Sequence, residues 1–447
     1  MGPFVRSAGV RAGAAGLVAC TALTACTSAP TAPTAPTSDP APRPARAPAS
    51  SEPPSATAAP PGRTCTEPLV LTRPHARGPF RLTARQARAR ASEAVPASRV
   101  DARARVAVVE GMHPMRRPHA YPLRTDTPCP EESVRPVTLT VVGDVMLARG
   151  VATASGGDLS RPLAATAPRL RRADLAVGNL ESTLSRAGAP TQGGDSFGAD
   201  PSAADALVDA GFDVVGLANN HTGDFGPAAL VRTVARARAA GLRTFGAGRD
   251  LAAARRPAVV EAGGTTYGFV GFNAIGETPA AAPGRPGAVQ VGMPPRTGPL
   301  DRAGLDRFLR DVRRLARRVD VVVVLPHWGE QYVHRPWPVQ RQVARDLVAA
   351  GADLVVGGHP HQVQGTSTVG GALVVHSLGN FVFDMDFAGP TMEGAVLETT
   401  WWGGELKAAE LVPYRMDASF TPRWLRWPEA RRVLAPAAPF SGPAFRF

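Results

Sequence analysis

The chain has 447 residues, about three times a typical domain length, so two or more structural segments are expected. Its 50 basic and 37 acidic residues give a net charge of +13, and 46 glycines with 45 prolines make up about a fifth of the chain. Residues 27–135 hold sixteen arginines against nine acids, whereas residues 136–447 carry only +4. This basic arm is broken by Pro and Ala and has few aromatic residues, so no nucleic-acid partner is expected.

Residues 1–26 have the composition of a secretory signal peptide: two arginines, then a small apolar run at residues 12–25, and no acid. The apolar run is too short to span a bilayer. It ends in Leu23-Thr24-Ala25-Cys26, which resembles the lipobox of bacterial lipoproteins. We therefore expect lipidation of Cys26 and an exported protein attached to the cell membrane by its N-terminal lipid. Cys20 also fits the motif but would leave a cramped apolar region, and an ordinary cleaved signal is the alternative.

Residues 27–64 consist largely of Ala, Pro, Ser and Thr and cannot bury enough apolar surface to fold, which predicts a disordered tether. Residues 65–135 form a small segment to which the sequence assigns no function; residues 83–95 have a helical, Arg-rich pattern that Pro96 ends. Cys65 and Cys129 are expected to form a disulfide, because an exported chain meets an oxidising compartment. The alternative is two unpaired buried thiols.

From residue 137 onward, short apolar runs alternate with amphipathic stretches. Buried strands are predicted at residues 137–142, 175–177, 214–217, 266–271, 321–325 and 354–356. Helices are predicted at residues 227–240, 301–318 and 338–350, and further strands at residues 395–401 and 406–414. This alternation predicts an α/β layered domain with a mainly parallel or mixed sheet. The expected boundaries are residues 136–388 for this domain and 389–447 for a C-terminal extension packed on it.

Polar residues follow five of the predicted strands. They are Gly143-Asp144, Asn179-Leu180-Glu181, Asn219-Asn220-His221, His327-Trp328-Gly329-Glu330 and Gly358-His359-Pro360-His361. Loops at strand carboxyl ends converge in layered α/β folds, and these side chains suit Mn, Fe, Zn or Mg. One such residue alone is more often structural, but four of the nine histidines fall in these loops. The sequence therefore predicts a site for one or two divalent metal ions.

Four further residues have open interpretations. His334 and His376 are expected to contact metal ligands and orient them, without binding the metal themselves. Asp224 is either the N-cap of the helix that starts near Pro227 or a catalytic residue. Arg149 either supplies positive charge near the site or is a solvated residue at a helix start.

A family resemblance rests on six blocks in order. They are Gly143-Asp144-Val145-Met146-Leu147-Ala148-Arg149, Asn179-Leu180-Glu181, Ala218-Asn219-Asn220-His221, His327-Trp328-Gly329, Gly358-His359-Pro360-His361-Gln362-Val363-Gln364 and Ser377-Leu378-Gly379-Asn380-Phe381. Over residues 137–386 these blocks resemble the capsule-synthesis CapA family, also called poly-γ-glutamate capsule proteins. The family resembles calcineurin-like metallophosphatases, which implies a layered β-sandwich flanked by helices with a two-metal site at the strand ends.

The resemblance also implies residue roles. Asp144, Glu181, Asn220, His327, His359 and His361 match metal ligands, and His221 matches the general acid. Two departures stand out: the usual Asp-x-His motif is Asp144-Val145-Met146 here, and Asn179 and Glu181 replace the usual second-motif aspartates. They imply that one metal position is weaker or empty.

Three functions remain open at this point. The leading hypothesis is a lipid-anchored CapA-like metallophosphatase, with metal-dependent hydrolysis as its expected reaction, that acts in biosynthesis or export of an anionic surface polymer such as capsule or poly-γ-glutamate. Its expected partners are that polymer or its precursor and a membrane polymer-synthesis or export complex. The alternatives are a non-catalytic polymer-binding or assembly subunit, favoured by the lost first-motif histidine, and a general secreted phosphoesterase or nuclease.

Overall fold

The computed structural model describes residues 64–73, 80–100, 105–110, 112, 114, 121–128, 135–185 and 187–442. The expected signal peptide, the lipidation site Cys26 and residues 27–63 of the expected tether lie outside this range. Cys129 also lies outside it, so the disulfide with Cys65 stays a prediction. None of the helices in the described part is long and apolar enough to cross a membrane.

The segment before residue 129 has small sheets and its own apolar cluster. Its elements are β1 (Thr64–Val70), β2 (Thr72–Arg73), β3 (Arg81–Leu82), α1 (Ala84–Ala89), β4 (Val95–Pro96), β5 (Arg105–Val106), β6 (Val108–Val109) and β7 (Arg124–Pro128). Leu71, Phe80 and Tyr121 are buried together in this cluster. The antiparallel register of β1 and β7 puts Cys65 opposite Thr127, two residues before Cys129 in the sequence.

The main domain contains two large sheets. Sheet I has the order β11 (Arg243–Phe245), β10 (Val214–Gly216), β9 (Leu175–Leu180), β8 (Val137–Val145), β21 (Glu393–Trp402), β22 (Glu405–Met416) and β23 (Pro422–Trp424), and β20 (Asn380–Val382) also pairs with β8. The strands from β11 to β8 run parallel, and β20 runs parallel to β8. The C-terminal strands β21, β22 and β23 are antiparallel members of the same sheet.

Sheet II has the order β13 (Ala258–Ala262), β14 (Thr265–Asn273), β16 (Val321–His327), β17 (Leu354–Val356), β19 (Ala372–Val375) and β18 (Thr366–Val369). Its four central strands are parallel, and both edge strands are antiparallel. A separate short pair joins β12 (Ala247–Gly248) to β15 (Gly287–Ala288). Parallel strands buried on both faces have continuous apolar runs, as in the Val321–His327 strand.

The two sheets pack face to face. Leu139 and Val141 of β8 share one buried cluster with Val323 and Leu325 of β16. Because successive strand side chains alternate between faces, the neighbours Val142 and Val324 lie in two other clusters on the outer faces. A β-sandwich with apolar outer faces needs covering helices.

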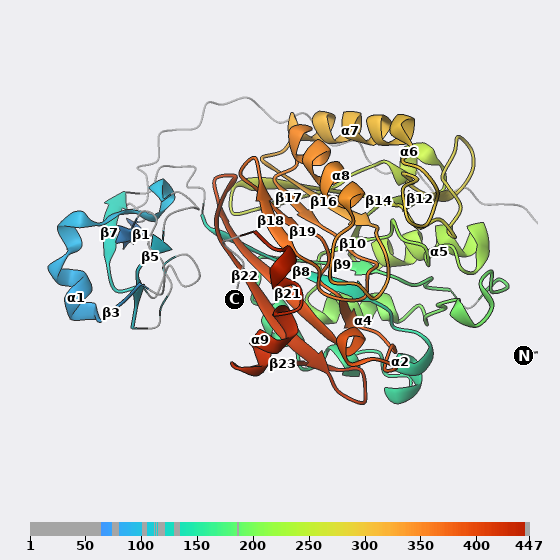
Figure 1. The fold of residues 1–447 in the computed structure, drawn as a ribbon, viewed down its shortest axis with the longest axis horizontal. Coiled ribbons are helices and arrows are strands. Elements are labelled where there is room, and N and C mark those ends of the chain that lie inside the picture. Colours follow the sequence, from blue (N-terminus) through green and yellow to red (C-terminus); the bar gives the residue numbers. More distant parts are fainter. Residues whose placement is uncertain are drawn as a thin grey trace, which may run out of the picture. The chain divides into compact units, whose positions relative to one another are not determined.

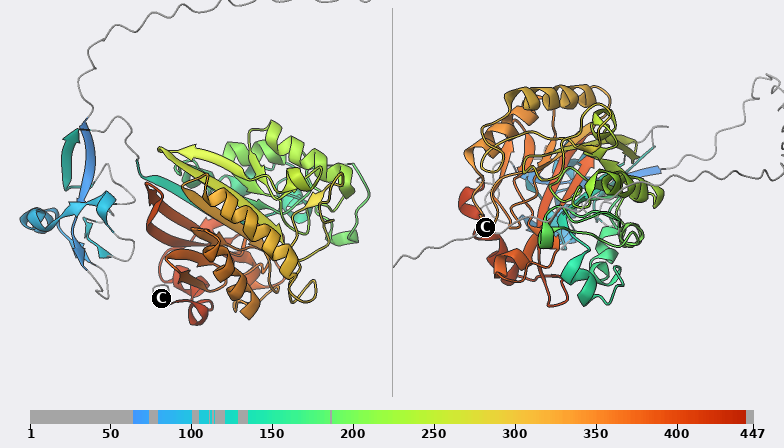
Figure 2. Two further views of the ribbon diagram at one scale, coloured as in Figure 1. Left: turned by 90° about the horizontal axis from the view of Figure 1, so that it is seen from above. Right: turned by 90° about the vertical axis from the view of Figure 1, so that its right-hand side faces the viewer.

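Helices supply that cover on both sides (Figures 1 and 2). Sheet I packs against α2 (Arg149–Ala154), α3 (Ala167–Leu170), α4 (Ala203–Ala210) and α5 (Gly226–Ala239), and sheet II against α6 (Leu251–Ala254), α7 (Arg302–Ala316) and α8 (Pro338–Ala349). The last helix, α9 (Glu429–Leu434), joins the cluster between the sheets. This helix–sheet–sheet–helix arrangement confirms the expected α/β sandwich flanked by helices.

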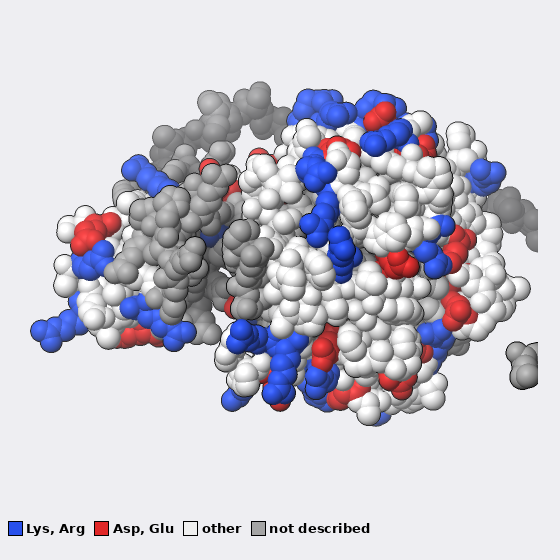
Figure 3. Space-filling model, viewed as in Figure 1, with Lys and Arg blue, Asp and Glu red and all other residues white. Residues whose placement is uncertain are grey.

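The helix α7 illustrates how local sequence sets local structure. Asp301 caps it by accepting a hydrogen bond from the Gly304 backbone N–H at 2.9 Å. Leu305, Phe308 and Val312 recur at helical spacing and are buried against sheet II. Its arginines lie on the outside, and on the face drawn in Figure 3 basic and acidic side chains are interspersed.

Candidate metal centre

The parallel strands of both sheets end at one edge of the sandwich. In sheet I, Asp144 at the end of β8 pairs with Asn179 in β9. In sheet II, His327 at the end of β16 pairs with Asn273 and bridges to Gly358. The loops that follow these strands therefore meet, as expected for strand carboxyl ends.

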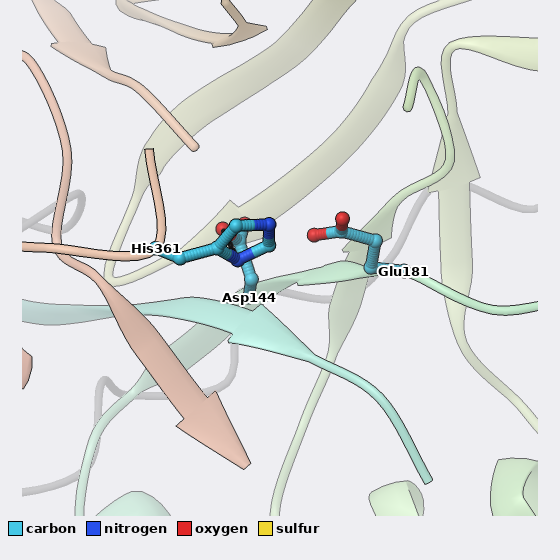
Figure 4. A group of neighbouring side chains, drawn as sticks. All are labelled: Asp144, Glu181 and His361. Carbon is cyan, nitrogen blue, oxygen red and sulfur yellow. Dashed lines mark ion pairs between the residues drawn. The ribbon is translucent and has the colours of Figure 1, made fainter. Parts of the chain in front are cut away.

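Two buried carboxylates and one imidazole form the centre of this edge. The ligand atoms of Asp144, Glu181 and His361 all lie within 4.8 Å of one another, and all three residues are buried. Figure 4 shows the Glu181 carboxylate pointing toward the His361 ring and Asp144. Asp144 accepts hydrogen bonds from Asn179 Nδ2 at 2.9 Å and from the His359 backbone N–H at 3.0 Å. Glu181 accepts one from Asn179 Nδ2 at 3.2 Å through Oε2, whereas its Oε1 is buried without a hydrogen-bond partner.

Two more histidines complete the cluster. His327 Nε2 lies 3.6 Å from Glu181 Oε1 and 2.8 Å from Asn220 Oδ1. The His359 ring lies 5.1 Å from the His327 ring, centroid to centroid, and both of its nitrogens are buried without a hydrogen-bond partner. His361 Nδ1 donates to Asn380 Oδ1 at 2.7 Å, which leaves its Nε2 as the atom with a free lone pair. The unsatisfied buried ligand atoms of this cluster therefore belong to Glu181 and His359.

Burial dominates the electrostatics of these groups. It raises the pKa of Asp144 to about 6 and the pKa of Glu181 well above its usual range, the latter with a further rise from the nearby Asp144 charge. It lowers the pKa of His361 to about 4 and the pKa values of His327 and His359 well below their usual range. Neutral imidazoles have a lone pair free to bind a cation, and buried carboxylate charges are unfavourable without a positive partner. A divalent cation bound between them would provide that partner.

Backbone strain is concentrated at this edge. Seven residues other than glycine have positive φ in the described part of the chain, and five of them lie in the cluster or at its border. These five are Arg149 (45°), Glu277 (64°), Tyr332 (64°), His359 (92°) and His361 (55°). Such conformations are disfavoured for residues with a Cβ and persist where the surrounding structure enforces them, often at functional sites.

Asn220 is oriented by a residue that the sequence analysis missed. Its Nδ2 donates to Glu277 Oε2 at 2.7 Å, so its Oδ1 faces His327 and the cluster. Arg296 in turn pairs with Glu277 Oε1 at 3.2 Å. Glu277 lies in the loop after β14, four residues beyond the last strand residue Asn273, so the search for polar residues directly after each strand did not reach it.

Asn179 occupies the middle of the cluster as a hydrogen-bond donor. The Asn219 amide donates to the Leu180 carbonyl at 2.8 Å and to Asn179 Oδ1 at 2.9 Å, which turns Asn179 Nδ2 toward Asp144 and Glu181. An amide nitrogen that donates to both carboxylates does not act as a metal ligand. Where the usual motif has an aspartate, Asn179 therefore acts as a hydrogen-bond donor to the two carboxylates.

His221 lies at the border of the cluster with a dedicated partner. Its Nδ1 lies 2.8 Å from Asp224 Oδ2, and its Nε2 lies 3.9 Å from Glu181 Oε1. Asp224 also accepts from the Phe197 backbone N–H at 2.7 Å, and the Phe197 ring stacks on His221 at 3.7 Å. The N-cap interpretation of Asp224 is wrong, because Phe225 occupies the N-cap of α5 without any side-chain cap.

The other residues with open interpretations are placed as follows. The Arg149 guanidinium lies 4.2 Å from the Phe197 ring centroid and pairs with Asp384 at 2.5 Å, so Arg149 belongs to the border of the site. His334 Nδ1 donates to the Val363 carbonyl at 2.8 Å. The His376 ring lies 5.9 Å from the Trp328 ring, centroid to centroid. These two histidines contact neighbouring loops and not the ring nitrogens or carboxylates of the cluster.

Fold and site together define a layered α/β protein with a buried cluster of potential cation ligands at its strand ends. The model of the family described as bacterial capsule synthesis protein PGA_cap matches residues 138–385, which is more than half of the chain. The chain therefore belongs to this family of CapA proteins.

Individual relatives agree with the family match. The capsule biosynthesis protein CapA of Bacillus anthracis is 31% identical over 256 residues, covering 56% of this chain and 60% of the relative. The PGA biosynthesis protein CapA of Bacillus subtilis (strain 168) is 30% identical over 255 residues, covering 56% and 63%. The chain thus matches about three fifths of the length of these relatives. A solved structure of a hypothetical protein from Thermus thermophilus aligns at 17% identity with a TM-score of 0.38, over 62% of this chain and 99% of that one.

Proposed function

We propose that the domain is a metal-dependent hydrolase of the phosphoester class that acts on an anionic surface polymer, such as capsule or poly-γ-glutamate, or on its precursor. The polymer assignment draws on the relatives, which are named for capsule and PGA biosynthesis. The hydrolase assignment draws on the site. One observation carries it: Glu181 Oε1 and both His359 nitrogens are buried without hydrogen-bond partners beside Asp144 and His361. Buried polar atoms are otherwise almost always hydrogen-bonded, so these atoms are available to bind a ligand.

The residues divide into two roles. Asp144, Glu181, Asn220, His327, His359 and His361 would hold one or two divalent cations, of the group Mn, Fe, Zn and Mg. Cations held there would supply Lewis acidity and offset negative charge on a phosphoryl group. Asp224 fixes the His221 ring through Nδ1, which leaves Nε2 to pass a proton to a leaving group.

A second candidate function is a non-catalytic polymer-binding or assembly subunit that works within a membrane polymer-synthesis complex. Met146 favours it, because this residue stands where the first motif usually has a histidine. Met146 is fully buried, and its Sδ accepts a hydrogen bond from the Ala148 backbone N–H at 3.1 Å. The first motif therefore offers Asp144 alone as a ligand.

Elemental analysis combined with phosphoester hydrolysis tests the proposal. His359→Ala should lower bound divalent metal and hydrolysis together, because both ring nitrogens are buried at the cluster without another partner. His334→Ala is the matched control, since His334 bonds to a backbone carbonyl outside the cluster and its loss should change neither quantity. A purified protein that binds no divalent metal would contradict the centre itself.

His221→Ala separates the two candidate functions. His221 is proposed as a proton donor and not as a metal ligand. The His221→Ala variant should therefore bind as much metal as the wild type, while its hydrolysis rate should fall by roughly two to four orders of magnitude. A wild-type protein that binds metal and hydrolyses no phosphoester, with polymer export intact in the His221→Ala strain, favours the assembly subunit.

A further inference from the structure

Tyr332 lies at the border of the candidate metal centre, and its backbone has a strained conformation. It follows β16 by five residues, has φ of 64°, and is 43% exposed. Its backbone N–H donates to the Pro360 carbonyl at 2.8 Å, which ties it to the loop between His359 and His361. A β-carbon at positive φ is unfavourable, so the position would suit glycine better unless the side chain is needed.

The Tyr332 ring is held by two neighbours. It lies nearly parallel to the His361 ring, at 28° and 6.1 Å between centroids. Phe387, itself 65% exposed, contacts it edge to face at 5.4 Å and 89°. These contacts fix the ring beside a predicted metal ligand, and a phenylalanine would make them equally well.

The hydroxyl is the part of the side chain that packing does not explain. Among the described residues, no group forms a hydrogen bond with the Tyr332 hydroxyl. Partial burial raises its pKa; Asp195 and Glu181 raise it further, and Arg296 and Arg149 oppose them. The near-parallel ring contact with His361 and the backbone hydrogen bond to Pro360 place this hydroxyl beside the loop that carries His359 and His361.

Two arginines lie at the border of the cluster, and each is paired with a carboxylate. Arg149 is anchored by Asp384 and lies over Phe197, and Arg296 is anchored by Glu277. Asp195, 85% exposed in its side chain, also pairs with Arg149, at 3.6 Å. Both arginines are linked to residues at the cluster, Arg149 through Phe197 to His221 and Arg296 through Glu277 to Asn220.

We propose that Tyr332 is a substrate-orienting residue, whose hydroxyl donates a hydrogen bond to the phosphoryl oxygen of a substrate bound at the metal centre. This proposal rests on the proposed function and adds the group that recognises the anion. Its ring, fixed by His361 and Phe387, sets the direction of that hydrogen bond.

Inorganic phosphate is the probe that tests it, measured with the full chain loaded with Mn²⁺. Tyr332→Phe keeps both ring contacts and removes only the hydroxyl. A hydrogen bond to a charged group corresponds to roughly a ten- to one-hundred-fold change in affinity, so phosphate should bind that much more weakly, with unchanged metal content. Tyr267→Phe is the matched control: Tyr267 lies at the start of β14, the opposite end from the site, and its variant should bind phosphate as the wild type does.

The outcomes separate this proposal from the proposed function. Equal phosphate affinity in Tyr332→Phe and wild type overturns the role of Tyr332, as does a metal-loaded wild type that binds no phosphate. A wild type that binds phosphate more tightly than Tyr332→Phe but hydrolyses nothing supports the recognition role while the hydrolase proposal fails. Where hydrolysis is measurable, a rise in KM with metal content unchanged distinguishes recognition from a structural role.

Discussion

Glu181 links the proposed metal site to the stability of the fold. Burial, and then the charges of Asp144 and Asp224, raise its pKa well above the ordinary value of 4.5. The folded chain thus binds this proton more tightly than the unfolded chain does. The resulting contribution to stability is present in full below about pH 4.5, and the metal-free protein loses it as the pH rises toward the raised folded value.

Glu181→Gln should therefore stabilise the metal-free protein at neutral pH, since the amide keeps an oxygen for the Asn179 hydrogen bond and carries no charge. We expect its melting temperature in EDTA to exceed that of the wild type by roughly 2–4 °C per kcal/mol gained at pH 7.5, and to converge with it near pH 4.5. Added Mn²⁺ should raise the melting temperature of the wild type only. A variant that melts below the wild type in EDTA at pH 7.5 would be evidence against an uncompensated buried charge.

The acids and histidines of the cluster could be predicted because each lies at the end of a strand or within five residues after it, where the sheet topology decides the neighbours. Asp144 and His359 are examples. Glu277 and Tyr332 reach the site through the paths of longer loops, and their positive φ values are not visible in the sequence. Asp224 needed the position of His221 to be understood, because a carboxylate before a helix is most simply interpreted as a cap.

At the scale of elements, strands with strong apolar patterns and the long amphipathic helices were predictable. β8, β14 and β16 lie where their runs of Val, Leu and Phe predict them, and α7 where its buried stripe does. The helix predicted at residues 83–95 is shorter in the structure, ending at Ala89. It buries only Ala87, so too little apolar surface stabilises further turns. The three-residue strand β20 gave no periodic signal.

The contact between β8 and the segment leading into β20 sets the geometry of the centre. A Cβ built on Gly143 would lie 1.8 Å from the Gly379 carbonyl oxygen, and Asp144 N donates to that same oxygen at 3.1 Å. The next residue, Asn380, holds the His361 ring. The absence of a side chain at position 143 therefore brings two predicted ligands together.

Gly143→Ala should push these elements apart, with a loss of at least about 1–3 kcal/mol in the free energy of unfolding and a parallel loss of bound metal. Thermal unfolding and elemental analysis measure the two effects. Gly389→Ala is the control, because its Cβ would meet no atom within 4 Å and should leave both quantities unchanged. Normal metal binding by Gly143→Ala would show that the strand contact does not position the ligands.

At the scale of the whole molecule, the family match covers residues 138–385, and the expected targeting features lie at the opposite end of the chain. A hydrolase that acts on a polymer at the cell envelope would benefit from an anchor there, since attachment raises its concentration near the emerging chain. A single acyl chain binds membranes only marginally, and stable anchoring takes a second lipid or another attachment. The lipobox-like Leu23-Thr24-Ala25-Cys26 is typical of such lipidation.

We expect Cys26→Ser to release the protein from the membrane fraction, because serine lacks the thiol to which a lipid would be attached. Cys20→Ser is the matched control: this cysteine lies inside the apolar run of the expected signal peptide and would be removed with it, so its variant should stay with the membrane. Immunoblots of membrane and soluble fractions measure where each variant is found. If Cys26→Ser fractionates as the wild type does, lipidation at Cys26 is excluded; if Cys20→Ser alone is released, the lipid is attached six residues earlier and the tether is correspondingly longer.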